Sequence, residues 1–123
     1  NLRAASAVLR LAEIECRPFE TVASKAVAKD FVYFDPPYHP VSKTAYFTAY
    51  ARDGFGEADQ RRLAEVFTAL GPRGVKALLS NSMTDLVREI YDGHRIEEVL
   101  ATRAVNSRAD RRGKIAEALI RNY

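Results

Sequence analysis

The apolar residues of this chain recur with a helical period in some segments and form short β-rich runs in others. The helical period predicts helices over residues 2–12, 20–28, 56–70 and 83–93. The short runs predict strands at residues 13–16, 31–34, 75–80, 95–102 and 116–123. Strands that alternate with helices favour an α/β fold with a mostly parallel sheet and helices on both of its faces.

Two segments refine this picture. The run "FVYF" at 31–34 is apolar at every position, which is typical of a strand that helices cover on both sides. Residues 39–56 contain two glycines and form a loop that is too long for an ordinary connection, so we expect it to be functional.

Composition limits the class of protein. A chain of 123 residues has the size of one domain, and no apolar run is long enough to span a membrane. Its single cysteine, Cys16, excludes an intrachain disulfide, fits an intracellular, reducing location and is expected in the core. Two histidines and one cysteine are too few for a zinc cluster. The net charge of +3 is compatible with a nucleic-acid partner.

The stretch "FDPPY" carries the chemistry. Asp35 follows the strand at 31–34, so its carboxylate lies at the carboxyl end, where ligands of open sheets bind. Pro36 and Pro37 lack N–H groups and present carbonyl acceptors in a nearly fixed direction. Tyr38 adds a flat aromatic face. This set fits a planar amine such as that of a nucleobase. A helix-capping aspartate followed by a proline turn is the simpler alternative.

The corner formed by Asp35, Pro36, Pro37 and Tyr38 offers what an aromatic amine needs in order to act as a nucleophile. An aromatic amine is a poor nucleophile because its lone pair is delocalised into the ring. Two acceptors on its hydrogens localise the lone pair and stabilise the positive charge that develops on the nitrogen.

The segment "VYFDPPY" (32–38) resembles the catalytic motif of amino-methyltransferases. With "DPPYHPVSKTAYFTAY", "LLSNS" and "VNSRADRRGKIAEALIRNY", the chain resembles the Dam-type adenine-N6 DNA methyltransferases from Phe31 onward. In that family the first motif letter is commonly Asp for adenine, Ser for cytosine-N4 and Asn for protein glutamine. The resemblance implies a Rossmann-like, S-adenosylmethionine-dependent fold, double-stranded DNA as partner, and a prokaryotic or phage enzyme of DNA methylation or restriction-modification in the cytoplasm.

The resemblance also implies roles for the motif residues. Asp35 and the Pro36 carbonyl would bind the N6 amine, with Pro37 completing the catalytic motif and Tyr38 stacking on the adenine. The base must be flipped out of the duplex, because its amine is otherwise inaccessible.

Further residues are candidates for the substrate site. Phe47 and Tyr50 would wall the base pocket, with ordinary loop packing as the alternative. Ser80 and Asn81, at the end of the next strand, would contribute polar groups on the same rim. Helix capping by Ser82 or Thr84 explains part of that stretch equally well.

The densest basic run is predicted to contact DNA phosphates, which dominate nucleic-acid affinity. Its residues are Arg108, Arg111, Arg112 and Lys114. A solvated loop is the alternative. His39 and His94 are interpreted as structural or surface residues.

The chain departs from the family pattern near its start. The 34 residues before Asp35 contain no glycine, whereas the family has a glycine-rich cofactor loop there. "ECRPFETV" resembles the segment before the catalytic strand, so Phe19, together with Asp35, is a predicted cofactor contact. Pro18 stands where the family has an acid.

The resemblance therefore covers a C-terminal catalytic half, with the cofactor loop and the target-recognition domain absent from residues 1–123. The missing half would belong to the same or a separate chain, and the isolated chain is expected to be inactive. A non-catalytic nucleic-acid-binding remnant is the main alternative, and a small-molecule amine methyltransferase is a more distant one.

Overall fold

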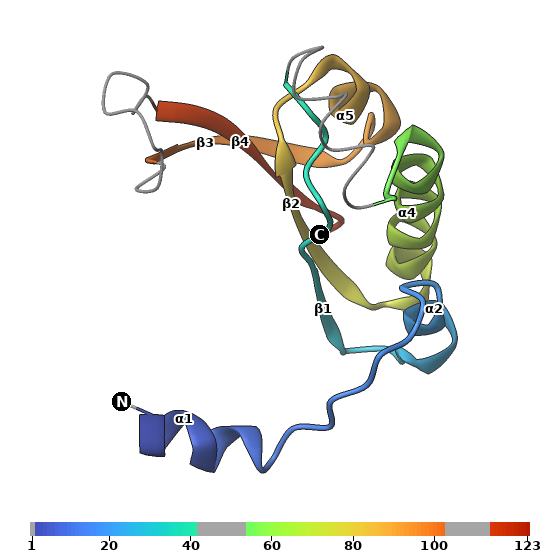
Figure 1. Cartoon of the computed structure of the whole chain (residues 1–123). Helices are drawn as coiled ribbons and strands as arrows, with labels where there is room; N and C mark the ends of the chain where they lie inside the picture. Colours follow the sequence, from blue (N-terminus) through green and yellow to red (C-terminus); the bar gives the residue numbers. More distant parts are fainter. Residues whose placement is uncertain (1, 42–53, 103–113) are drawn as a thin grey trace.

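The computed structural model describes residues 2–41, 54–102 and 114–123. Its strands form one mixed sheet in the order β1-β2-β4-β3, with bounds β1 (Phe31–Phe34), β2 (Lys76–Ser82), β3 (Arg95–Thr102) and β4 (Lys114–Arg121). The helices are α1 (Leu2–Leu9), α2 (Thr21–Lys25), α4 (Glu57–Leu70) and α5 (Asp85–Ile90), with a 3-10 turn η1 (Gly71–Arg73). The predicted α/β class is confirmed (Figure 1).

β1 and β2 are joined through α4 and run parallel, with Phe31 opposite Lys76. A parallel pair needs a long crossover, and α4 supplies it. The helix predicted over 56–70 is confirmed as α4, and the apolar face expected of it is buried at Leu63, Phe67 and Leu70 and partly buried at Val66. Gly74 follows η1 with a left-handed φ of 72°, which glycine adopts without strain, and the chain then enters β2.

The prediction of a mostly parallel sheet is wrong. β4 inserts between β2 and β3 and runs antiparallel to both, so two of the three strand pairings are antiparallel. Residues 103–113 connect β3 to β4, and this segment is shorter than the crossover of about a dozen or more residues that a parallel return needs. The sequence pattern identified the final strand but not its direction.

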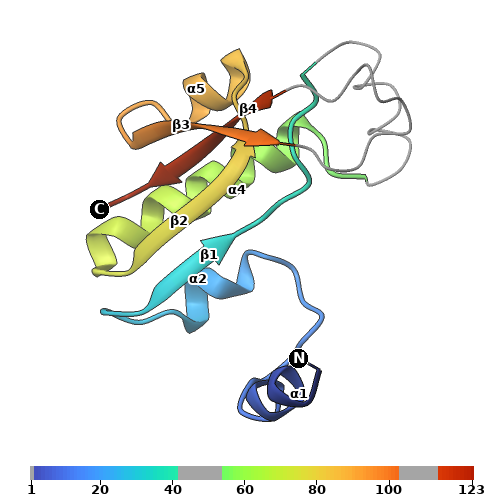
Figure 2. The ribbon, with the colours of Figure 1, turned by 90° about the vertical axis from the view of Figure 1, so that its left-hand side faces the viewer.

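The expectation of helices on both faces is also wrong for the described residues. α2, α4 and α5 lie on the same face of the sheet in Figures 1 and 2. Phe34 points into this core, whereas Phe31 and Tyr33 alternate to the opposite face and are 57% and 53% exposed. The described helices therefore leave one face of β1 open.

The N-terminal segment lies apart from this core. α1 buries no residue and stands away from the sheet in both ribbon views (Figures 1 and 2). Residues 13–16 form no strand, and Cys16 is exposed, so both expectations for this segment are wrong. The helices in residues 2–41, 54–102 and 114–123 are too short or too polar to cross a membrane.

Candidate active site

Asp35 leaves the end of β1 as an exposed residue whose carboxylate is held from one side. Ser80 Oγ donates to Asp35 Oδ1 at 2.8 Å, and the Tyr33 hydroxyl lies 2.9 Å from the same Oγ. A serine hydroxyl carries one proton, so Tyr33 must be the donor to Ser80. The three side chains form a relay that ends on the carboxylate, and no helix cap is formed by Asp35.

Tyr38 and Pro36 are half-buried next to this carboxylate. Burial raises the pKa of the Tyr38 hydroxyl. Tyr38 is therefore neutral at physiological pH. It presents an uncharged ring beside an anionic acceptor, a combination that suits a flat base carrying an amine.

A cavity of about 420 Å³ opens beside the corner. Its lining includes Arg17, Phe19, Asp35, Pro36 and Phe55. Phe19 and Asp35, which are 16 positions apart in the sequence, therefore border one space. The rings of Phe19 and Phe55 meet edge to face, with their centroids 5.9 Å apart.

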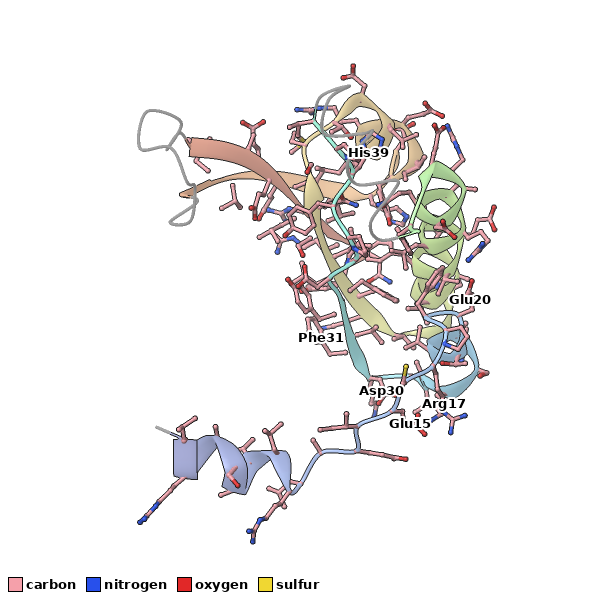
Figure 3. All side chains as sticks on the ribbon, viewed as in Figure 1. Glu15, Arg17, Glu20, Asp30, Phe31 and His39 are labelled. Carbon is pink, nitrogen blue, oxygen red and sulfur yellow. The ribbon has the colours of Figure 1, made fainter. Side chains whose placement is uncertain are left out.

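The segment that carries Phe19 is fastened to α4. The Arg62 guanidinium lies over the Phe19 ring, 5.7 Å from its centroid. The same guanidinium pairs with Glu20 and Asp59, both at 3.1 Å. Arg17, at the cavity, pairs with Glu15 at 2.8 Å. These contacts hold the aromatic wall in place next to β1, and Figure 3 shows Glu20 beside α4.

Sequence reasoning missed Tyr33 and Gln60 as supporting residues. Tyr33 lies two positions before Asp35, so strand alternation places both side chains on one face, which is a usable signal. Gln60 Nε2 donates to the Pro37 carbonyl at 2.8 Å. Its signal is helical phase, because position 60 precedes Leu63 and Phe67 by three and seven residues and therefore faces the core.

Ser80 and Asn81 are both buried in β2, at 3% and 0% exposed. Ser80 reaches Asp35, as described above. Asn81 is bonded to Gln60 and to the His39 backbone. Thr84 caps α5, accepting from the Val87 N–H at 3.3 Å, so capping does account for part of this stretch.

Both histidines have structural contacts. His39 Nδ1 lies 2.9 Å from Thr84 Oγ1, and His94 Nε2 lies 2.9 Å from Thr68 Oγ1. Figure 3 shows His39 near the α5 end of the sheet, far from Asp30 at the start of β1.

Several predicted residues lie outside the described part of the chain. They are Phe47 and Tyr50 of the predicted base pocket and Arg108, Arg111 and Arg112 of the basic run. Lys114 begins β4, where its backbone is opposite Thr102, and its side chain is not described.

The chain is similar to known proteins that act on DNA adenine. A family model described as D12 class N6 adenine-specific DNA methyltransferase matches residues 1–105. The chain belongs to this family.

Individual relatives agree with the family model. A type II methyltransferase, M.MjaIII of Methanocaldococcus jannaschii, is 43% identical over the whole chain, which covers 43% of that protein. A second, M1.LlaDCHI of Lactococcus lactis subsp. cremoris, is 44% identical over 85% of the chain and 37% of its own length. The DNA adenine methylase of Escherichia coli K12 is 36% identical over 85% of the chain and 37% of its length. The chain thus spans less than half of each of these relatives.

Proposed function

We propose that this chain carries the catalytic corner of a DNA adenine-N6 methyltransferase. The enzyme would transfer a methyl group from S-adenosylmethionine to the exocyclic amine of an adenine flipped out of double-stranded DNA. The observation that carries the proposal is the Ser80–Asp35 hydrogen bond of 2.8 Å. It orients an exposed carboxylate at the end of a strand, next to an aromatic side chain and a cavity.

Each residue of the corner has a defined task. One Asp35 oxygen accepts a hydrogen bond from Ser80. The lone pairs that remain on the carboxylate accept a hydrogen bond from the N6 amine. The Pro36 carbonyl is the second acceptor, and the Tyr38 ring stacks on the adenine. These contacts draw the amine lone pair away from the ring. The negative charge of Asp35 also stabilises the positive charge that develops on nitrogen during transfer.

The residues around the cavity suit the cofactor. Phe19 and Phe55 offer aromatic walls, and Asp35 places a carboxylate at the same space. A flat ring packs favourably against the aromatic walls, and a cationic group is favoured next to the Asp35 carboxylate. When bound, S-adenosylmethionine supplies an electrophilic methyl group on a positively charged sulfur. The role of this chain is to hold the adenine amine in reach of that methyl group and to exclude water from it.

The described sheet would then be the C-terminal part of a Rossmann-like methyltransferase fold. The glycine-rich cofactor loop and the target-recognition domain would be contributed by further sequence, in the same or in a separate chain. The open edge of β1 is a suitable position for a neighbouring strand, because it pairs with β2 on one side and, among the described residues, with no strand on the other.

The proposal is tested by Asp35→Asn in the longest natural form of the chain. The substitution keeps the shape of the side chain and removes its charge. Methyl transfer to duplex DNA should fall by about 10²–10⁴-fold, while the affinity for DNA changes little. Asp92→Asn is a matched control, because Asp92 is an exposed aspartate beyond α5. A mutant that keeps more than half of the wild-type turnover contradicts the proposal. DNA binding without any transfer by the wild type would instead support a non-catalytic remnant.

A further inference from the structure

Two side-chain amides are buried beneath the corner. Gln60 of α4 is 1% exposed and Asn81 of β2 is 0% exposed. A buried amide is costly unless its donors and acceptors are paired. Their partners therefore show which part of the structure they support.

The hydrogen bonds of these amides surround Tyr38. Gln60 Nε2 donates to the Pro37 carbonyl at 2.8 Å, and Asn81 Nδ2 donates to Gln60 Oε1 at 2.9 Å. The N–H of His39 donates to Asn81 Oδ1 at 2.8 Å. The peptide carbonyl before Tyr38 and the peptide N–H after it are thus held by one connected pair of amides.

The polarity of this pair is fixed by the backbone. Asn81 Oδ1 accepts from the N–H groups of both His39 and Ser82, each at 2.8 Å. Its Nδ2 must therefore point at Gln60 Oε1, which leaves Gln60 Nε2 as the donor to Pro37. Reversing either amide would place donors against donors at one end and acceptors against acceptors at the other.

We propose that Gln60 and Asn81 are positioning residues, an amide clamp that sets the backbone of Tyr38 and so the direction of its ring. Residues 35–40 belong to no helix or strand, and hydrogen bonds from neighbouring elements must therefore fix their conformation. A clamped Tyr38 presents its ring without the loss of conformational freedom that an unrestrained segment would incur on binding. This role rests on the proposed function, because it assigns the oriented ring to the flipped adenine.

The geometry of the clamp is tested first in the 123-residue chain, independently of activity. The His39 amide should be protected from hydrogen exchange in the wild type, and Asn81→Leu should abolish that protection. Leucine is similar in size to asparagine but offers no acceptor to the His39 N–H. Exchange of the His39 amide at the unprotected rate in the wild type would overturn the clamp itself.

Its role is then tested in the longest natural form, with 2-aminopurine at the target position. Gln60→Met and Asn81→Asp should lower turnover by about 10- to 100-fold, as expected for a misplaced reacting geometry. They should also reduce the fluorescence change on binding, while the affinity for DNA changes little. Asn81→Asp keeps the acceptor for His39 but repels Gln60 Oε1.

Leu70→Ala is the control for general loss of stability. Leu70 is 0% exposed near the far end of α4, so its truncation weakens packing without touching the clamp. It should leave the fluorescence change and turnover intact at a temperature where the protein is folded. If Gln60→Met behaves like Leu70→Ala, the positioning role is wrong. If Asp35→Asn also retains turnover, the proposed function has failed instead.

Discussion

Ser80 and Asp35 are joined across the parallel pair of β1 and β2 by a hydrogen bond of 2.8 Å. The strand register accounts for it, since Phe34 is opposite Leu79 and the next residues of the two strands therefore face each other. The residue that follows β1 therefore meets a buried hydroxyl of the neighbouring strand β2.

Ser80→Ala should impair catalysis in the longest natural form of the chain. A hydrogen bond to a charged group contributes about 1.5–3 kcal/mol, which corresponds to a loss of turnover of about 10- to 100-fold. Tyr33→Phe is the matched control, because it removes the donor to Ser80 but leaves the Ser80–Asp35 bond. Its effect should be clearly smaller. Steady-state methyl transfer measures both, and equal losses in the two variants would contradict the assigned order of the relay.

Tyr38→Ala should weaken capture of the flipped base more than Tyr38→Phe does. The ring face is the proposed contact, and loss of stacking costs about 1–3 kcal/mol per base. Fluorescence of 2-aminopurine at the target position should rise on binding to the wild type and to Tyr38→Phe, and rise less with Tyr38→Ala. Equal damage by the two substitutions would show that the hydroxyl, and not the ring, is the functional group.

Most helices and strands, and the corner at residues 35–38, could be predicted because the local order of apolar, polar and proline residues determines them. The unbroken apolar run at 31–34 predicts β1, and the apolar stripe that includes Leu63, Phe67 and Leu70 predicts α4. Asp35 was placed at a strand end by the two prolines that follow it. These features depend on neighbours in sequence.

The errors concern relations between distant segments. The insertion of β4 between β2 and β3 depends on pairing, and an apolar run has the same appearance in either direction. The open face of β1 depends on which helices cover it. Gln60 looked like one more polar residue in the first turns of α4, because its partner carbonyl on Pro37 is 23 positions away.

Tyr91→Phe should stabilise the protein. Tyr91 is 0% exposed and packs edge to face on Phe67, with centroids 5.4 Å apart, but its hydroxyl has no hydrogen-bond partner among the described residues. An unsatisfied buried hydroxyl costs about 1–3 kcal/mol, so its removal should raise the melting temperature. Phe67→Ala provides the contrast, because it removes a ring from the same aromatic cluster and leaves a cavity. It should lower the free energy of unfolding by about 3–5 kcal/mol. A lower melting temperature for Tyr91→Phe would show that the hydroxyl is satisfied.

The same residue predicts a loss of stability in alkali. Burial raises the pKa of Tyr91 above its ordinary value of 10.0, so the unfolded chain releases this proton first as the pH rises. Stability is therefore fully present below about pH 10 and falls above it. In Tyr91→Phe this decline should be shallower, as followed by urea titrations at several pH values. If the stability of Tyr91→Phe declines with rising pH as steeply as that of the wild type, Tyr91 is not the source of the alkaline destabilisation.

Mild acid should also destabilise the fold, through His94. Its ring meets Phe67 edge to face at 5.1 Å, and burial lowers its pKa below the ordinary value of 6.5. The unfolded chain therefore binds a proton first, and stability falls as the pH drops below 6.5. Burial also lowers the pKa of His39, which adds to the effect. His94→Gln should flatten the profile between pH 6.5 and about 5, above the range where most carboxylates titrate. If the stability of His94→Gln falls with pH as steeply as that of the wild type, His94 is not the source of the acid sensitivity.

The isolated 123-residue chain should self-associate through β1. This strand is at one edge of the sheet and carries Phe31 and Tyr33 on an open face, a combination that favours pairing with another chain. β3, at the other edge, carries Arg95, Glu97 and Glu98, charges of the kind that discourage such pairing. Phe31→Glu should therefore shift the chain toward monomer in light-scattering measurements, helped by Lys76 opposite it in the register.

Val99→Lys tests the opposite edge. Val99 is a 40% exposed residue of β3, and its register partner is Glu117, so the new lysine is well tolerated. It should leave self-association unchanged, because the charged edge of β3 is not the contact. Association that persists in Phe31→Glu but disappears when α1 is removed would assign the contact to α1, whose Leu2, Val8 and Leu9 are exposed. Association lost only in Val99→Lys would assign it to β3, and either result would contradict the role of β1.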